Sequence, residues 1–155
     1  MKTHTSSLAL VLITAICLVA SQPVLAQSHT IQVSGEIHEQ FIQVIVTPNG
    51  VTATASDGWT GSLAGSGIAH IFSSDVIDFI NGIEENVIST RILFTSSGNL
   101  FLKEVGSRNG DFVTVDSTVV GGTGIFKDAT GQLLLEGIHV NGVQFTYTGS
   151  ITLEE

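Results

Sequence analysis

Hydrophobic and polar residues alternate with a period of two near both ends of the chain. The apolar side of residues 144–153 carries Phe145, Tyr147, Ile151 and Leu153. The apolar side of residues 30–38 carries Ile31, Val33 and Ile37. Because successive side chains of a β-strand point to opposite faces, both segments predict strands with one buried face and one polar face.

Similar runs rich in Val, Ile, Thr and Phe recur along the rest of the chain, separated by turn signals. This spacing is typical of antiparallel sandwiches and barrels. It predicts eight strands, at residues 30–38, 41–47, 60–72, 87–95, 100–106, 112–120, 132–139 and 144–153. Residues 74–86 are predicted to form a loop with one helical turn, and residues 121–131 also break the rhythm.

The predicted turns contain residues that tolerate a positive φ. They are Pro48-Asn49-Gly50, Ser97-Gly98-Asn99, Arg108-Asn109-Gly110 and Asn141-Gly142. The last of these is a strong two-residue hairpin signal, so we expect the final two strands to form a hairpin.

Three segments are apolar on both faces, namely Val44-Ile45-Val46, Ile92-Leu93-Phe94 and Leu133-Leu134-Leu135. Such strands need cover on both sides, either from contact between copies in an oligomer or from an apolar interior. Eight strands closed on themselves remove the sheet edges and enclose room for side chains or one small ligand. We therefore expect an all-β fold, a closed eight-stranded antiparallel β-barrel with little helix, and a sandwich remains the alternative.

The first 26 residues have the features of a secretory signal peptide. Lys2 precedes an apolar run from Leu8 to Ala20, and small residues before position 27 suit a signal peptidase. The run of about 13 residues is too short to span a bilayer, and Ile16 before Cys17 does not fit lipoprotein processing. We expect cleavage after Ala26, no membrane anchor, and a secreted or periplasmic single domain at residues 27–155.

The composition narrows the classes of partner. The part after residue 26 has no cysteine, so we expect no disulfide there. It contains four basic and 14 acidic residues, which gives a net charge of about −10. This charge disfavours binding to nucleic acid or anionic lipid. With 43% hydrophobic and 12% charged residues, the chain is predicted to be globular, acidic and soluble.

One motif is distinctive. Residues 119–131 read VVGGTGIFKDATG, a strand end, a glycine-rich corner, a tight turn with an inward phenylalanine, and a glycine that restarts the next strand. No Lys-Ser or Lys-Thr follows, which argues against a phosphate-binding loop. The pattern G-G-T-G-x-F-x-x-A-x-G, followed by a hairpin ending in FTYTGSI, resembles the allene oxide cyclase barrel superfamily, which includes the plant dirigent proteins. The resemblance is specific over residues 113–153.

The resemblance implies an eight-stranded barrel, often a dimer or trimer, that holds an apolar small molecule in its interior. It also implies chemistry without a cofactor, in which a reactive intermediate is oriented and shielded from water during cyclisation or coupling. The catalytic residues of the plant enzymes do not carry over, because the segments that hold them do not align here.

Four residues are candidates for chemistry. Arg91, Glu104 and Asp116 fall within predicted strands among apolar neighbours, where a charge is costly unless it is paired or faces water. If they face the interior, they could act as acid, base and electrostatic clamp, with Tyr147 as a further proton donor. The alternative is an outward, solvated position.

Three aromatic residues are candidate ligand contacts, namely Trp59, Phe145 and Phe94. Trp59 follows Asp57-Gly58 at the start of a predicted strand and could stack on a ligand or lie at the rim or in the core. His38, His70 and His139 lie on different strands without metal-ligand spacing, so no metal is expected. No hydrolase motif is present.

Two functions from different classes remain open. The first is a non-catalytic secreted protein that binds a hydrophobic small molecule in its interior. The second is a cofactor-free cyclase or isomerase, which requires an open apolar interior that contains at least one ionisable side chain.

Overall fold

The computed structural model describes residues 27–73, 75–78 and 82–154, so the predicted signal peptide lies outside the described residues. The strands are β1 (Ser28–Thr47), β2 (Gly50–Trp59), β3 (Gly65–Ser73), β4 (Asp75–Asp78), β5 (Ile83–Thr95), β6 (Gly98–Asn109), β7 (Phe112–Gly122), β8 (Thr130–His139) and β9 (Val143–Glu154). Two short 3-10 turns, η1 (Gly61–Leu63) and η2 (Gly124–Phe126), complete the set. No helix within the described residues is long and apolar enough to cross a membrane.

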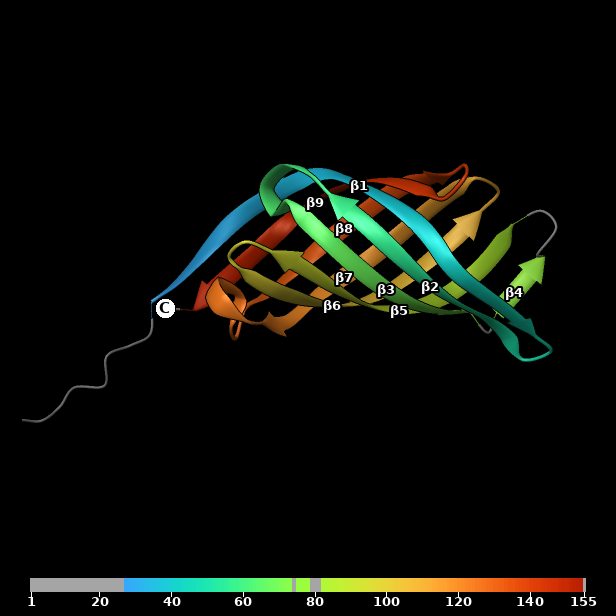
Figure 1. Ribbon diagram of the computed structural model, residues 1–155, viewed down its shortest axis with the longest axis horizontal. Coiled ribbons are helices and arrows are strands. Elements are labelled where there is room, and N and C mark those ends of the chain that lie inside the picture. The colour runs from blue at the N-terminus through green and yellow to red at the C-terminus, as the bar shows by residue number, and fades with distance from the viewer. Residues whose placement is uncertain (1–26, 74, 79–81, 155) are drawn as a thin grey trace, which may run out of the picture.

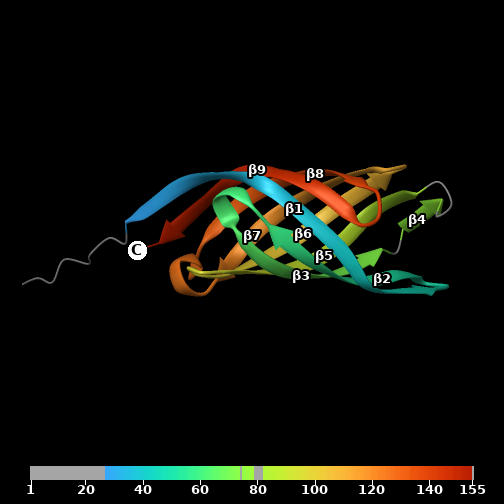
Figure 2. The same cartoon turned by 45° about the horizontal axis from the view of Figure 1, so that its top comes forward.

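All strands belong to one antiparallel sheet in the order β3-β2-β1-β9-β8-β7-β6-β5-β4. Strand β3 also pairs with β5, so eight strands ring round and β4 extends the edge of β5 (Figures 1 and 2). The prediction of an all-β antiparallel fold is confirmed. The predicted alternation is also confirmed, since Val33, Ile37, Phe145, Tyr147, Ile151 and Leu153 are buried.

The number of strands in the ring is as predicted, but three of the predicted strand assignments differ. The strand predicted at 60–72 begins only at Gly65, because residues 61–63 form η1. The predicted break near Glu39 and Gln40 does not occur, because β1 continues through them and only shifts register between Phe41 and Gln43. The segment 50–59, which was not predicted as a strand, forms β2. Its alternation of Val, Ala and Thr is a strand pattern, but Ala, Gly and Asp weaken the β-propensity.

The register shift in β1 decides which of its residues face inward. An extra residue in one strand of an antiparallel pair reverses the alternation beyond it. Glu39 is therefore inward before the shift and Val44 beyond it, and both line the interior. The predicted loop at 74–86 is partly wrong, since residues 75–78 form β4 and residues 83–86 belong to β5, with which β4 pairs. Residues 74 and 79–81 lie outside the described residues.

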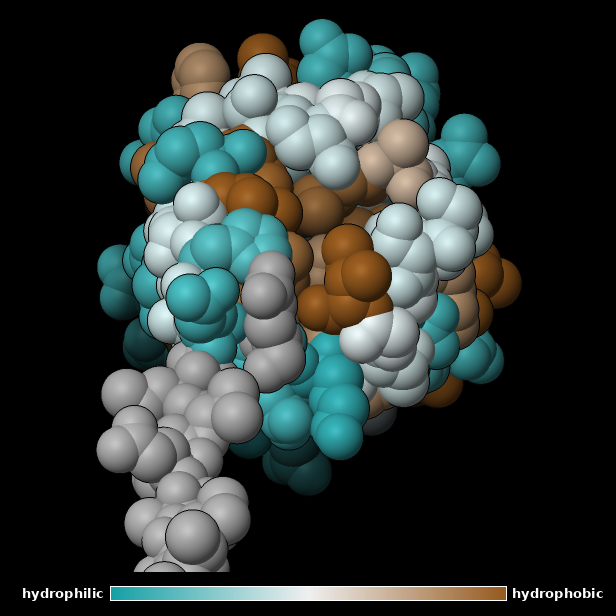
Figure 3. Space-filling model, turned by 90° about the vertical axis from the view of Figure 1, so that its left-hand side faces the viewer, coloured by the Kyte–Doolittle hydropathy of each residue, from teal (hydrophilic) through white to brown (hydrophobic). Residues whose placement is uncertain are grey.

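The glycine-rich corner forms a tight turn with an inward phenylalanine, as predicted. Residues 121–131 turn through η2 and bury Phe126 against the core. A Cβ on Gly122 would come within 2.0 Å of the carbonyl oxygen of Asn99, so this close backbone approach requires glycine. Figure 3 faces this end of the molecule, where hydrophobic side chains show between hydrophilic ones.

The hairpin signal at Asn141-Gly142 is confirmed. His139 pairs with Val143, so the loop between β8 and β9 has three residues, 140–142, and both Asn141 and Gly142 take a positive φ. In the segments that are apolar on both faces, successive residues alternate between the interior and the outer surface. Leu93, Leu133 and Leu135 are buried inside, whereas Ile92, Phe94 and Leu134 point outward with 38–41% of their surface exposed.

Candidate functional site

The interior of the ring is filled on one side and hollow on the other. Next to the corner, Trp59, Leu100, Phe126 and Tyr147 belong to a continuous buried core. Toward the opposite end, where the β1–β2 and β8–β9 hairpins lie, a cavity of about 340 Å³ remains. This volume is at the lower end of the range of about 300–1,000 Å³ for small-molecule pockets.

The cavity wall is mainly apolar, with polar groups at its two ends. Its wall includes Phe41, Val44, Ile71, Val113 and Phe145. Its mouth carries Glu84, Arg108 and His139, and its inner end carries Glu39, Ser89, Arg91 and Glu104. Burial and the nearby Arg108 lower the pKa of His139, whose ring lies 5.7 Å from that of Phe41. An apolar molecule in this cavity would meet ionisable side chains at both ends.

Arg91 is the centre of the inner cluster. It projects from β5 and is opposite Ala69, which is opposite Ala55, so two small residues leave space for its long side chain to cross the interior. Its guanidinium donates to Glu104 Oε1 at 2.9 Å, Asp57 Oδ2 at 2.5 Å and Glu39 Oε2 at 3.0 Å. One cation thereby pairs with carboxylates from β1, β2 and β6.

Glu104 is held by its cross-strand neighbours as well as by Arg91. The sheet register places Ser89 of β5 and Ser117 of β7 directly opposite Glu104. The Ser89 hydroxyl donates to Glu104 Oε2, and the Ser117 hydroxyl donates to Oε1 at 3.4 Å. All three residues are buried, so this row fixes the carboxylate inside the ring.

Asp57 connects the cluster to the filled side of the interior. Its Oδ2 also accepts a 3.0 Å hydrogen bond from the indole nitrogen of Trp59. The Trp59 ring lies 5.8 Å from the Arg91 guanidinium and 4.9 Å from the Tyr147 ring. A Cβ on Gly67 would come within 2.7 Å of Asp57 Oδ2, so glycine at this position leaves room for the carboxylate.

The cluster has more carboxyl groups than positive charges, and this excess shifts the pKa values of Glu39 and Arg91. Burial raises the pKa of Glu39, and the negative charges of Asp57 and Glu104 add to the rise, while Arg91 opposes it. Burial disfavours the charge on Arg91, but Glu104, Glu39 and Asp57 outweigh it and raise the Arg91 pKa. Glu39, whose pKa is raised, also lines the cavity.

The structure places the four candidates for chemistry differently. Arg91 and Glu104 lie together at the inner end of the cavity. Tyr147 is buried on the filled side, where its hydroxyl donates to Thr60 O at 2.8 Å and accepts from Leu63 N at 2.9 Å, and burial raises its pKa. Asp116 is exposed on the outer surface of β7, which is the outward, solvated alternative.

The three aromatic candidates also lie in different parts of the structure. Phe145 lines the cavity, Trp59 is in the core beside the Arg91 cluster, and Phe94 points outward. Sequence reasoning did not select Glu39 or Asp57. The strand pattern of residues 50–59 contained the signal for Asp57, because it puts Val51, Ala53, Ala55, Asp57 and Trp59 on one face.

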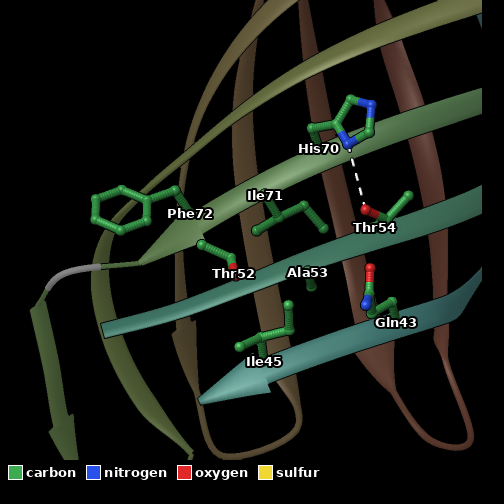
Figure 4. Close-up of a pocket in the computed structure, with 8 residues that line it drawn as sticks. All are labelled: Gln43, Ile45, Thr52, Ala53, Thr54, His70, Ile71 and Phe72. Carbon is green, nitrogen blue, oxygen red and sulfur yellow. Dashed lines mark hydrogen bonds between the residues drawn. The ribbon is translucent and has the colours of Figure 1, made fainter. Parts of the chain in front are cut away.

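A second hollow, of about 280 Å³, lies on the outer surface of β1, β2 and β3 (Figure 4). Gln43, Ile45 and Phe72 contribute to it, and Thr54 Oγ1 lies 3.3 Å from His70 Nδ1. Its polar side chains are all exposed or half-buried. The interior cavity, in contrast, contains buried ionisable groups, so we take the interior cavity as the candidate functional site.

No protein-family model matches the chain, and no curated protein matches it. Solved structures do match, among them the following two. One is a pterocarpan synthase dirigent protein, 16% identical, with 91% of this chain and 100% of that chain covered and a TM-score of 0.57. The other is a pyocyanin demethylase, 14% identical, with 75% of this chain and 98% of that chain covered and a TM-score of 0.52. At these identities the likeness is one of fold alone, and the predicted resemblance is confirmed at that level: the chain shares its fold with a dirigent protein.

Proposed function

We propose that the ring of eight strands is a closed barrel that binds an apolar small molecule in its interior cavity. The observation that carries the proposal is the cavity of about 340 Å³ between apolar walls, next to a core that fills the other side. Support for closure comes from the pairing of β3 with β5. We also propose that the protein is secreted and acts without a cofactor.

A volume-filling variant tests this proposal. Val115 is buried and lines the cavity, whereas the preceding residue, Thr114, points outward from the same strand. Val115→Trp should occupy the cavity and abolish binding of the neutral probe 1-methylnaphthalene in isothermal titration calorimetry. Thr114→Trp should leave binding unchanged. Equal binding by both variants, or no binding by the wild type, would overturn the proposal.

A second candidate function is proton transfer to a bound substrate, as in a cofactor-free isomerase or cyclase. It is favoured by the position of Glu39, a buried carboxyl that lines the cavity. Burial raises the pKa of Glu39, and a raised pKa keeps a carboxyl protonated to higher pH, as a general acid requires. Glu39 would protonate the carbonyl oxygen of a bound ketone while an α-proton leaves to solvent.

Hydrogen–deuterium exchange of 1-tetralone in D₂O, followed by NMR, tests this second function. The wild type should accelerate exchange at the α-carbon relative to buffer, and Glu39→Gln should remove the acceleration. Glu36→Gln, on the exposed side of the same strand, is the matched control. Equal rates for wild type and Glu39→Gln would show that Glu39 is not a general acid.

A further inference from the structure

The inner end of the cavity has an excess of negative groups. Within the described part of the chain, the carboxylates of Glu39, Asp57 and Glu104 all pair with the same cation, Arg91. The side chains of all four residues are at most 3% exposed. When all three carboxyl groups are ionised, the cluster carries two uncompensated negative charges away from water, which is costly.

These carboxylates occupy most of the hydrogen-bond donors of Arg91. It donates four hydrogen bonds to carboxylate oxygens, through Nε, Nη1 and twice through Nη2. A guanidinium has five N–H groups. An anionic ligand group at the inner end would therefore compete with three carboxylates for a cation that is already occupied, and like charge would repel it.

A buried hydroxyl group also lines this cavity. Ser73 on β3 lines it, is 3% exposed, and within the described residues its hydroxyl has no hydrogen-bond partner. The register puts Ser73 two positions beyond Ile71, which pairs with Ser89, so it lies between the inner cluster and the mouth. A buried hydroxyl without a partner costs stability, and a polar atom of a ligand could bond to it.

The walls favour a particular kind of positive group. Phe41 and Phe145 present aromatic rings in the cavity. A delocalised or alkylated nitrogen cation is attracted to aromatic faces, and recognition of such cations by aromatic pockets is common. A compact ammonium with a full hydration shell would lose more water on entry than such a cation does.

From the carboxylate excess and the unpartnered Ser73 hydroxyl, we infer that the ligand of this cavity is a small apolar cation whose positively charged nitrogen lies at Glu39. This rests on the proposed binding function and adds the substrate class to it. A cation at Glu39 favours the ionised carboxylate, so binding releases a proton and strengthens as the pH rises. The other charged groups that face Glu39 are Arg91, Asp57 and Glu104, and those at the mouth are Glu84, Arg108 and His139.

Three two-ring probes separate charge from shape. N-methylquinolinium is the cation, 1-methylnaphthalene is its neutral isostere, and 1-naphthoate is an anion on the same frame. At pH 8, calorimetry with the purified protein should show the cation binding at least about tenfold more tightly than the neutral probe, and 1-naphthoate should bind most weakly. At pH 5 the preference should shrink, and titrations in two buffers of different ionisation enthalpy should show that binding of the cation releases protons.

Glu39→Gln keeps the shape of the side chain and removes the charge, so it should abolish most of the preference. Exposed Glu36→Gln should retain it, which excludes a general attraction of cations to an acidic protein. Val115→Trp should weaken all probes together, which locates them in the cavity. The inference is overturned if the neutral or anionic probe binds as tightly as the cation, or if Glu39→Gln leaves the preference intact. In those cases the binding function still stands, whereas failure of every probe to bind overturns both.

Discussion

Replacing Arg91 by methionine tests whether this residue is the counter-ion of the buried cluster. The change removes four hydrogen bonds and leaves Glu39, Asp57 and Glu104 inside the ring without a positive partner. Breaking a buried ion pair from one side costs about 3–5 kcal/mol, because the remaining charge stays desolvated. We expect Arg91→Met to lower the free energy of unfolding by that amount at pH 7.

The loss should depend on pH. Arg91 lowers the pKa of Glu39, so its removal raises that pKa further above the unfolded value. A group with a raised folded-state pKa stabilises the folded protein at low pH and loses that contribution as the pH rises. The cost of Arg91→Met should therefore be smaller at pH 5 than at pH 8.

Urea unfolding followed by fluorescence is a suitable assay, because Trp59 is the chain's single tryptophan and lies 5.8 Å from the Arg91 guanidinium. Lys103→Met is the matched control, since Lys103 is exposed on β6 next to Glu104 and should cost less than about 0.5 kcal/mol. A loss for Arg91→Met below about 1 kcal/mol that is also independent of pH would refute the reasoning.

Three further variants probe other parts of the structure. Glu39→Gln should gain stability relative to wild type between pH 5 and pH 8 in the same assay. The stability that Glu39 contributes to the wild type is complete below the unfolded pKa of about 4.5 and is lost as the pH rises through the raised folded pKa. A difference in stability that stays constant with pH would contradict this. Tyr147→Phe removes two hydrogen bonds to backbone groups and should cost about 1–3 kcal/mol without changing ligand binding, as urea unfolding and calorimetry would show. Gly122→Ala, whose Cβ meets the Asn99 carbonyl, should lower the thermal midpoint clearly more than Gly58→Ala, whose Cβ meets nothing within 4 Å, and equal midpoints would argue against close packing at the corner.

The fold could be predicted largely because burial of one face of a strand produces an alternating pattern in the local sequence. Period-two alternation identified Phe145, Tyr147, Ile151 and Leu153 as buried, and they are. The strand of residues 50–59 was missed because its inward positions are mostly small, so its apolar signal is weak although its alternation is regular. The continuity of β1 was missed because Glu39 and Gln40 resemble a break between strands.

The candidate site could be predicted only in part. Arg91 and Glu104 stood out as charges within apolar strands, but their direction depends on register, which a one-residue shift reverses. Asp116 had the same local pattern and points outward. Glu39 and Asp57 were not selected. The pattern of residues 50–59 indicates an inward Asp57, but no local feature indicates the partner, Arg91, which is 52 residues from Glu39 and 34 from Asp57.

The sequence by itself determined the antiparallel strands, most of the turns, the glycine-rich corner and the dirigent-like resemblance, because each of these depends on neighbours along the chain. The tertiary structure alone decided that β3 pairs with β5, that one side of the interior is filled while the other is hollow, and that three carboxylates meet one guanidinium. Those features depend on residues from β1, β2, β5 and β6 that come together only when the strands ring round. The charge balance that marks the candidate site is therefore a property of the packed ring.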